Sequence, residues 1–196
     1  MRVTRKLQAE HRTAMLRHAA RLFQGRGVAG VAVADVAQAA GLTHGAFYGH
    51  FDSKAALVAE ACRDSLEDSA RRWREVVARA EAEGRDPLEA LIERYLTAEH
   101  RDGPDHGCAL AALGAEAVRD PVLRGGLAHG TMALLDVLED VIAARLPAEG
   151  APREAAAAVL AALTGGLVIA RAFADSPAQS HAALAAARRA ARAVTS

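Results

Sequence analysis

Helical spacing of apolar residues recurs in nearly every segment of this chain and constrains its fold more than any other feature. Within residues 10–24, for example, Leu16, Ala19, Ala20 and Phe23 follow one another at intervals of three and one, which places them on one face of a helix. The alternation typical of strands is absent, and Ala, Leu, Arg and Glu, which cost least in a helix interior, dominate the composition. The sequence therefore predicts an all-α fold.

Glycine, proline and capping residues divide the chain into nine expected helices. Four N-terminal helices are expected at about residues 10–24, 34–40, 43–51 and 54–83. Five more follow, separated by breaks at residues 84–87, 102–107, 120–121, 146–152 and 176–177. Asp52 and Ser53 are suitable N-caps for the long fourth helix. We expect a domain boundary to fall within that helix.

Charge is distributed unevenly along a chain whose formal net charge is zero. Residues 1–60 contain eight Lys/Arg and four Asp/Glu, so the N-terminal third is basic and the remainder is acidic. Because phosphate neutralisation dominates affinity for nucleic acids, only the N-terminal third is expected to meet a polyanion. The alternative is that these charged residues only form a surface exposed to solvent, which would give the same numbers of basic and acidic residues.

The second and third expected helices have the arrangement of a helix-turn-helix, which can place its second helix in the major groove of DNA. Gly41 provides the turn, and the hydroxyl of Thr43 can cap the next helix by accepting a backbone N–H. Phe47 and Phe51 lie one turn apart, so we expect both to face inward.

The opposite side of the third expected helix carries Gly45, Tyr48, Gly49 and Asp52. A glycine in a helix costs roughly 1 kcal/mol relative to alanine, so two glycines on one exposed side need a reason. Close approach of the backbone to DNA would provide that reason, and Tyr48 can reach a phosphate or a thymine methyl group. The alternative is a tight helical corner that only packs the first domain.

Residues 34–54, which read ADVAQAAGLTHGAFYGHFDSK, resemble the helix-turn-helix signature of the TetR family of regulators. Residues 12–23, which read RTAMLRHAARLF, are similar to the first helix of that family. The resemblance implies a DNA-binding domain over about residues 9–69. It also implies a helical body over residues 70–196 that dimerises and encloses an effector pocket. The implied function is that of a homodimeric repressor, released from double-stranded operator DNA by an unidentified small molecule.

The resemblance also implies which residues meet DNA. The recognition helix would run from Thr43 to His50, with Thr43 and His44 near bases or phosphates. Tyr48 and His50 would contact the DNA backbone, and Lys54 would hold a phosphate. The candidate DNA-binding residues are Thr43, His44, Gly45, Tyr48, His50 and Lys54. Val33 and Gly49 depart from the family pattern, because relatives often have a hydroxyl residue at the first position and a bulkier side chain at the second.

The last two expected helices combine leucines with many small residues, which let helices approach closely. Gly165 and Gly166 would give an especially close contact or a kink. The family resemblance implies that these two helices form the dimer interface, and an ordinary intramolecular bundle is the alternative. Arg188, Arg189 and Arg192 are interpreted as solvated charges near a helix C-terminus.

Candidate residues for the effector pocket can be chosen only by residue type, and each of them also suits a plain core. They are Trp73, Tyr95, Cys108, Met132 and Phe173. Cys108 follows a glycine turn beside His106, a setting that can activate a thiol, so a redox-sensing regulator is an alternative to ligand control. Cys62 is interpreted as a core residue.

Several classes of function lack support in the sequence. We find no Gly-rich phosphate loop, no nucleophile elbow and no spacing of His or Cys typical of a metal site, so we expect neither an enzyme nor a cofactor. No signal peptide or uninterrupted apolar span of about 20 residues is recognised, so we expect a cytoplasmic protein that does not enter the membrane. A helical interaction module that no longer binds specific DNA remains a third alternative.

Overall fold

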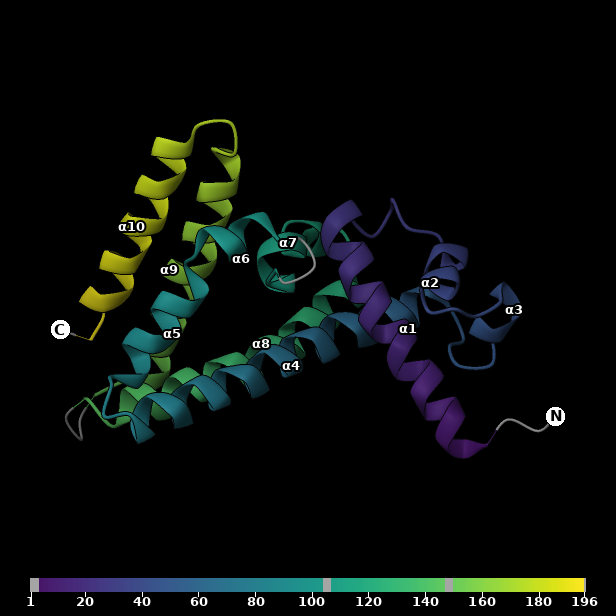
Figure 1. The fold of residues 1–196 in the computed structure, drawn as a ribbon, viewed down its shortest axis with the longest axis horizontal. Helices are drawn as coiled ribbons and strands as arrows, with labels where there is room; N and C mark the ends of the chain where they lie inside the picture. Colours follow the sequence, from purple (N-terminus) through teal and green to yellow (C-terminus); the bar gives the residue numbers. More distant parts are fainter. Residues whose placement is uncertain (1–3, 104–106, 147–149, 196) are drawn as a thin grey trace.

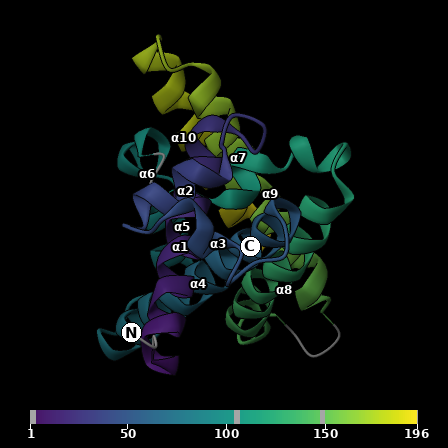
Figure 2. The same ribbon diagram turned by 90° about the vertical axis from the view of Figure 1, so that its right-hand side faces the viewer.

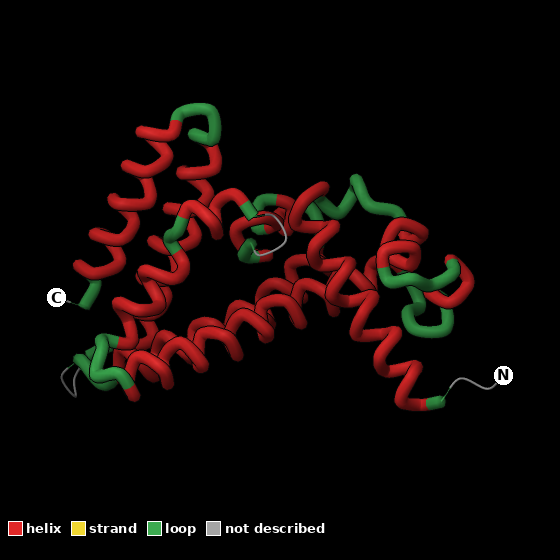
Figure 3. Tube along the Cα trace, viewed as in Figure 1, coloured by secondary structure: helices red, strands yellow, loops and turns green. Residues whose placement is uncertain are grey.

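The computed structural model describes residues 4–103, 107–146 and 150–195, and these residues form helices and connecting loops without a strand (Figure 1, Figure 3). The all-α prediction is confirmed. The helices are α1 (Arg5–Arg26), α2 (Val33–Ala39), α3 (His44–Phe47), α4 (Lys54–Ala82), α5 (Pro87–Tyr95), α6 (Ala98–Asp102), α7 (Ala109–Leu113), the 3-10 helix η2 (Glu116–Val118), α8 (Pro121–Ala143), α9 (Pro152–Ala172) and α10 (Pro177–Ala193).

The described residues contain ten α-helices, whereas the sequence predicted nine. The extra helix arises because the segment after Pro87 is interrupted at Leu96 and Thr97. The hydroxyl of Thr97 accepts the backbone N–H of His100 at 3.0 Å, so it caps a new helix, α6. The first helix also starts earlier than predicted, because the Thr4 hydroxyl accepts the N–H of Leu7 at 3.3 Å.

Helices α4 and α8 run side by side along the lower side of the molecule in Figure 1. The backbone of α8 lies against α4 at two glycines. A Cβ atom at Gly126 would overlap the carbonyl of Ala59, and one at Gly130 would lie 2.5 Å from the Cβ of Leu66. The residue numbers increase together along both helices from the first contact to the second, so the two helices run parallel and pack closely.

The helix-turn-helix and the last two helices lie at opposite ends of this pair (Figure 1). Helices α1, α2 and α3 surround the beginning of α4, and Figure 2 turns this end toward the viewer. Helices α9 and α10 form an antiparallel pair at the other end. The buried side chains of all these elements form one continuous core.

Helix α10 is attached to α5 by arginines. Arg188 donates to the backbone carbonyl of Leu96, and Arg192 forms a two-pronged ion pair with Glu89. The interpretation as a solvated charge is therefore wrong for the half-buried Arg188, whereas Arg189 and Arg192 are exposed, as that interpretation expects.

Among the described residues, α9 is the one helix whose length and composition would allow it to cross a membrane. Thr164, Gly165 and Gly166 interrupt its apolar run, so the expectation that no uninterrupted apolar span of about 20 residues occurs is not contradicted. A helix in the core of a soluble protein can meet the same criteria. Only 39% of the apolar window of α9 is buried, since the helix packs on α8 and α10 with one face and leaves the other uncovered.

The glycine contact between α8 and α4 makes a direct prediction about stability. Gly126→Ala should lower the free energy of unfolding by about 1–3 kcal/mol, because the new methyl group meets backbone atoms that cannot move aside. The matched control is Gly125→Ala, since a Cβ there meets nothing within 4 Å and should add up to about 1 kcal/mol through helix propensity. Urea unfolding followed by circular dichroism measures both, and equal effects would contradict the packing described here.

Candidate nucleic-acid interface and ligand cavity

The helix-turn-helix is built around a glycine turn and two buried phenylalanines. Gly41 has a φ of +71°, a conformation that side chains other than glycine rarely adopt, and it separates α2 from α3. Phe47 and Phe51 are at most 2% exposed and stack with their ring centroids 5.5 Å apart. The prediction that these two rings face inward is confirmed, and their burial fixes which side of α3 faces solvent.

Helix α3 is shorter than the predicted recognition helix, because only His44–Phe47 is α-helical and residues 48–50 form a turn. Thr43 occupies the N-cap position, but its hydroxyl makes no capping hydrogen bond. The expectation that this hydroxyl caps the helix is therefore wrong. The Thr43 side chain is instead exposed.

The exposed side of α3 carries Gly45, Tyr48 and Gly49. The Tyr48 side chain is 61% exposed and its ring meets that of His44 edge to face at 5.6 Å. A Cβ atom at Gly45 would meet nothing within 4 Å, and one at Gly49 would make an ordinary contact with the Ala46 carbonyl at 3.4 Å. Neither glycine has a positive φ. Internal packing and backbone conformation therefore do not explain a glycine at either position.

His50 and Lys54 lie deeper than the other candidate DNA-binding residues. The ring of His50 meets that of His11 edge to face at 6.3 Å. Burial, together with the charges of His11 and Arg12, lowers the pKa of His50. The Lys54 ammonium donates to the carbonyl of Val28 at 2.7 Å, so at least one of its three hydrogens is used in a hydrogen bond within the protein.

Val28 links the helix-turn-helix to the C-terminal part of the chain. Its carbonyl accepts from Lys54, and its N–H donates to the carboxylate of Glu116 in η2 at 3.1 Å. Sequence reasoning missed Glu116, because nothing in its local sequence connects it with residues almost 90 positions away. Val33 was expected just before the second helix, but it is the first residue of α2, and the N-cap residue is Ala32, which has no side-chain hydroxyl to cap the helix. The Asp35 carboxylate accepts the N–H of Ala32 at 2.8 Å.

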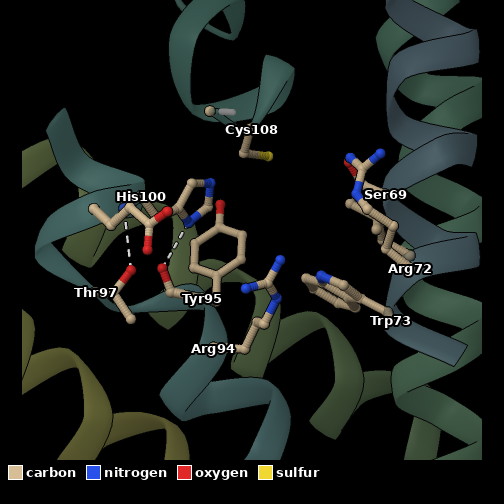
Figure 4. Close-up of a pocket in the computed structure, with 11 residues that line it drawn as sticks. Ser69, Arg72, Trp73, Arg94, Tyr95, Thr97, His100 and Cys108 are labelled. Carbon is tan, nitrogen blue, oxygen red and sulfur yellow. Dashed lines mark hydrogen bonds between the residues drawn. The ribbon is translucent and has the colours of Figure 1, made fainter. Parts of the chain in front are cut away.

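A cavity of about 100 Å³ lies between α4, α5, α8 and the segments around α6 and α7 (Figure 4). It is lined by Ser69, Arg72, Trp73, Arg94, Tyr95, Thr97, Glu99, His100, Gly107, Cys108 and Leu134. Three of the five candidate pocket residues, Trp73, Tyr95 and Cys108, thus lie in one cavity. The other two do not line it: Met132 is 53% exposed on α8, and Phe173 is 42% exposed at the end of α9.

The cavity holds polar groups that sequence reasoning missed, among them Arg72, Arg94 and His100. The Nδ1 atom of His100 lies 2.6 Å from the carbonyl of Tyr95, and the two rings meet edge to face at 4.5 Å. Burial lowers the pKa of His100 despite this hydrogen bond, and nearby arginines lower it further, which favours the neutral ring. Helical spacing places each of these residues on a face, but their convergence depends on how α4, α5 and α6 pack together.

The two cysteines are free and buried. Burial, followed by the charges of Glu116 and Asp120, raises the pKa of Cys62 to about 12, and this residue lies in the core as predicted. Cys108 is 4% exposed and occupies the N-cap position of the five-residue helix α7. His106, its neighbour in the redox hypothesis, lies outside the described residues. The part of the chain that the structure describes contains no group of three His, Cys, Asp or Glu residues that could hold a metal ion.

Comparison with known proteins connects this geometry with a family. The profile described as "Bacterial regulatory proteins, tetR family" matches residues 15–61. The transcriptional repressor KstR2 of Rhodococcus jostii is 44% identical over 81 residues, which cover 41% of this chain and 39% of that protein. The match thus spans about two fifths of the length of this curated relative.

Solved structures extend the likeness to the whole fold. A TetR-family transcriptional regulator from Rhodococcus sp. is 28% identical, with a TM-score of 0.72 over 96% of this chain and 100% of that one. FadR of Bacillus subtilis, solved in complex with stearoyl-CoA, has the same fold, with 14% identity and a TM-score of 0.66 over 94% of this chain and 97% of that one. Residues 15–61 thus carry the conserved region of bacterial TetR-family regulators, and the chain shares the fold of solved TetR-family structures over almost its whole length.

Proposed function

We propose that this protein is a homodimeric transcriptional repressor that binds operator DNA through α3 and releases it when a small molecule occupies the C-terminal body. The observation that carries the proposal is the exposed side of α3. Gly45 leaves open space beside the backbone there, and the side chains of Thr43 and His44 are exposed next to it. Such a surface lets the backbone of α3 come close to the edges of bases in the major groove.

The proposed DNA contacts divide into two groups. Thr43, His44 and Gly45 would approach bases or phosphates, and Tyr48 would contact the DNA backbone. His50 and Lys54 would hold phosphates at the edge of the interface, where Lys54 has hydrogens to donate beyond the one bound to Val28. We place the DNA-binding domain at residues 9–69 and the body at residues 70–196. A protein with this function works in the cytoplasm, where the DNA lies, and catalyses no reaction.

The uncovered face of α9 supports a dimer. Val168 and Ile169 are 47% and 52% exposed on this face, and Ala161 and Gly165 continue it toward the helix N-terminus. Nothing within 4 Å would meet a Cβ at Gly165, whereas a Cβ at the adjacent Gly166 would overlap Ala187 of α10. The lack of a side chain at Gly166 thus allows α9 to pack closely on α10. The lack of a side chain at Gly165 leaves room for a helix of a second copy.

Two structural connections would couple the body to the DNA-binding domain. Helix α4 carries Trp73 in the wall of the cavity and Lys54 beside the helix-turn-helix, and α8 packs closely along it. Val28 adds a second connection, from Lys54 to Glu116. The FadR relative holds stearoyl-CoA within the same fold. A ligand that favours one position of α4 would thereby change the separation of the two α3 helices in the dimer and lower operator affinity.

Gly45→Ala tests the DNA-binding surface. The protein first selects duplexes from a random library, and fluorescence anisotropy then measures its affinity for the selected duplex at several salt concentrations. The variant should bind about tenfold more weakly, a change of about 1.4 kcal/mol, because the methyl group occupies the space needed for close approach. Its free energy of unfolding should be unchanged or higher, since nothing inside the protein meets the new atom.

Gly125→Ala is the control, because it adds a methyl group to open space on α8, away from α3. Wild-type affinity should fall steeply as salt rises, since phosphates release counterions on binding. Failure of the wild-type protein to select any duplex would contradict the proposal and favour a helical interaction module instead.

Gly165→Leu tests the dimer interface. The side chain should block the close approach of a second copy and shift the protein toward monomer in analytical ultracentrifugation, with helix content and monomer fold preserved. The control Gly125→Leu places the same side chain in open space on α8 and should leave the dimer intact. A Gly165→Leu variant that stays dimeric at the concentrations where wild type dimerises would exclude this face.

A further inference from the structure

The cavity is small and has aromatic walls. Its volume of about 100 Å³ is less than the roughly 150 Å³ of an apolar cavity that holds benzene in another protein, so it can take up no more than one planar ring. The rings of Trp73 and Tyr95 meet edge to face at 5.9 Å between centroids, and Leu134 and Cys108 add apolar surface to the lining. The walls therefore favour a compact planar group at this position.

The hydroxyl of Tyr95 is a buried donor that the protein leaves available. The side chain is 3% exposed, and its oxygen makes no hydrogen bond to a nitrogen or oxygen atom of the described residues. The thiol beside it, from Cys108, is only a weak acceptor. Burial raises the pKa of Tyr95 well above its ordinary value, so the hydroxyl keeps its proton. A ligand oxygen in the cavity would satisfy this donor.

Two guanidinium groups make the same cavity electropositive. Arg72 of α4 and Arg94 of α5 both line it, and neither forms an ion pair with a carboxylate among the described residues. Arg72 donates to the hydroxyl of Ser69 at 2.9 Å. Burial, followed by the charge of Arg94, lowers the pKa of Arg72. Glu99 is the one carboxylate of the lining, and it is exposed, as are Arg72 and Arg94, so the two arginines outnumber it by one positive charge at the mouth of the cavity.

These groups are arranged around the same space (Figure 4). The rings of Tyr95 and His100 lie on one side and Arg72 lies on the other, beside α4, while the Arg94 guanidinium projects between Tyr95 and Trp73 in this view. A guanidinium binds a carboxylate through paired, charge-assisted hydrogen bonds. The cavity thus offers an aromatic wall, a neutral donor and two cations to a single ligand.

We infer that the cavity binds a small aromatic carboxylate, with its ring against Trp73 and Tyr95 and its carboxylate on the two arginines. The Tyr95 hydroxyl donates to one carboxylate oxygen. The inference rests on the function proposed above, for which it names the chemical class of the effector.

Binding can be measured directly, because Trp73 is the only tryptophan of the chain and lines the cavity. Its fluorescence is followed while the full-length dimer is titrated with benzoate, 4-hydroxybenzoate or phenylacetate, and with the corresponding neutral amides. At least one acid should give a saturable change and bind tenfold or more tightly than its amide. Arg94→Gln should weaken binding of that acid at least tenfold. The control is Arg74→Gln, since Arg74 is exposed on α4 and does not line the cavity.

Tyr95→Phe distinguishes a ligand-binding hydroxyl from a structural one. The buried hydroxyl lies beside only a weakly accepting thiol, so its removal should raise the melting temperature of the unliganded protein, while the same change should weaken binding of the acid about threefold to tenfold. A higher melting temperature together with weaker binding of the acid is expected only if the hydroxyl binds the ligand. A lower melting temperature together with unchanged affinity would overturn the role assigned to Tyr95.

The outcomes separate this inference from the proposed function. If no acid binds more tightly than its amide, or if Arg94→Gln has no effect, the ligand class is wrong. Selection of a DNA duplex by the same protein preparation would then still support the DNA-binding part of the proposal. If an acid binds as expected but leaves affinity for the selected duplex unchanged, the ligand class stands and release by this ligand is wrong.

Discussion

The close packing of α8 on α4 is the constraint on which the rest of the structure depends. Gly126 and Gly130 bring the two backbones so near that even a methyl group would not fit between them. One end of α4 therefore positions the helix-turn-helix, and its other half provides a wall of the cavity. Because the pair is rigid, a change in the position of Trp73 relative to α5 is expected to move α4 as a unit, and the helix-turn-helix with it.

Most of the fold could be predicted because it follows from local patterns. The buried pair Phe47 and Phe51, the glycine turn at Gly41 and the cap at Ser53 are all set by neighbouring residues, and the structure contains each of them. The break at Thr97 was missed, since a hydroxyl residue can either continue a helix or cap a new one. Which of the two occurs depends on the packing of α6 against α9.

Only the part of the candidate site that consists of consecutive residues could be predicted from the sequence. Residues 43–54 lie together because they are consecutive, and their roles at DNA remain predictions. The cavity combines residues from several helices, so residue type alone placed Met132 and Phe173 in it although both are exposed elsewhere. Periodicity shows which face of a helix is apolar, but it does not show which neighbour covers that face. Arg72 and Arg94 were missed for the same reason.

In the proposed dimer, the attachment of α10 to α5 would connect the cavity of each copy with the dimer interface. Arg192 holds Glu89 and Arg188 holds the carbonyl of Leu96, and the cavity residues Arg94 and Tyr95 lie between these two anchor points on α5. A shift of α5 around a ligand would therefore move α10, which packs on α9, the helix whose uncovered face would meet the second copy. Ligand binding and dimerisation would then be thermodynamically linked, so that apparent ligand affinity depends on protein concentration and the two halves of the dimer fill cooperatively.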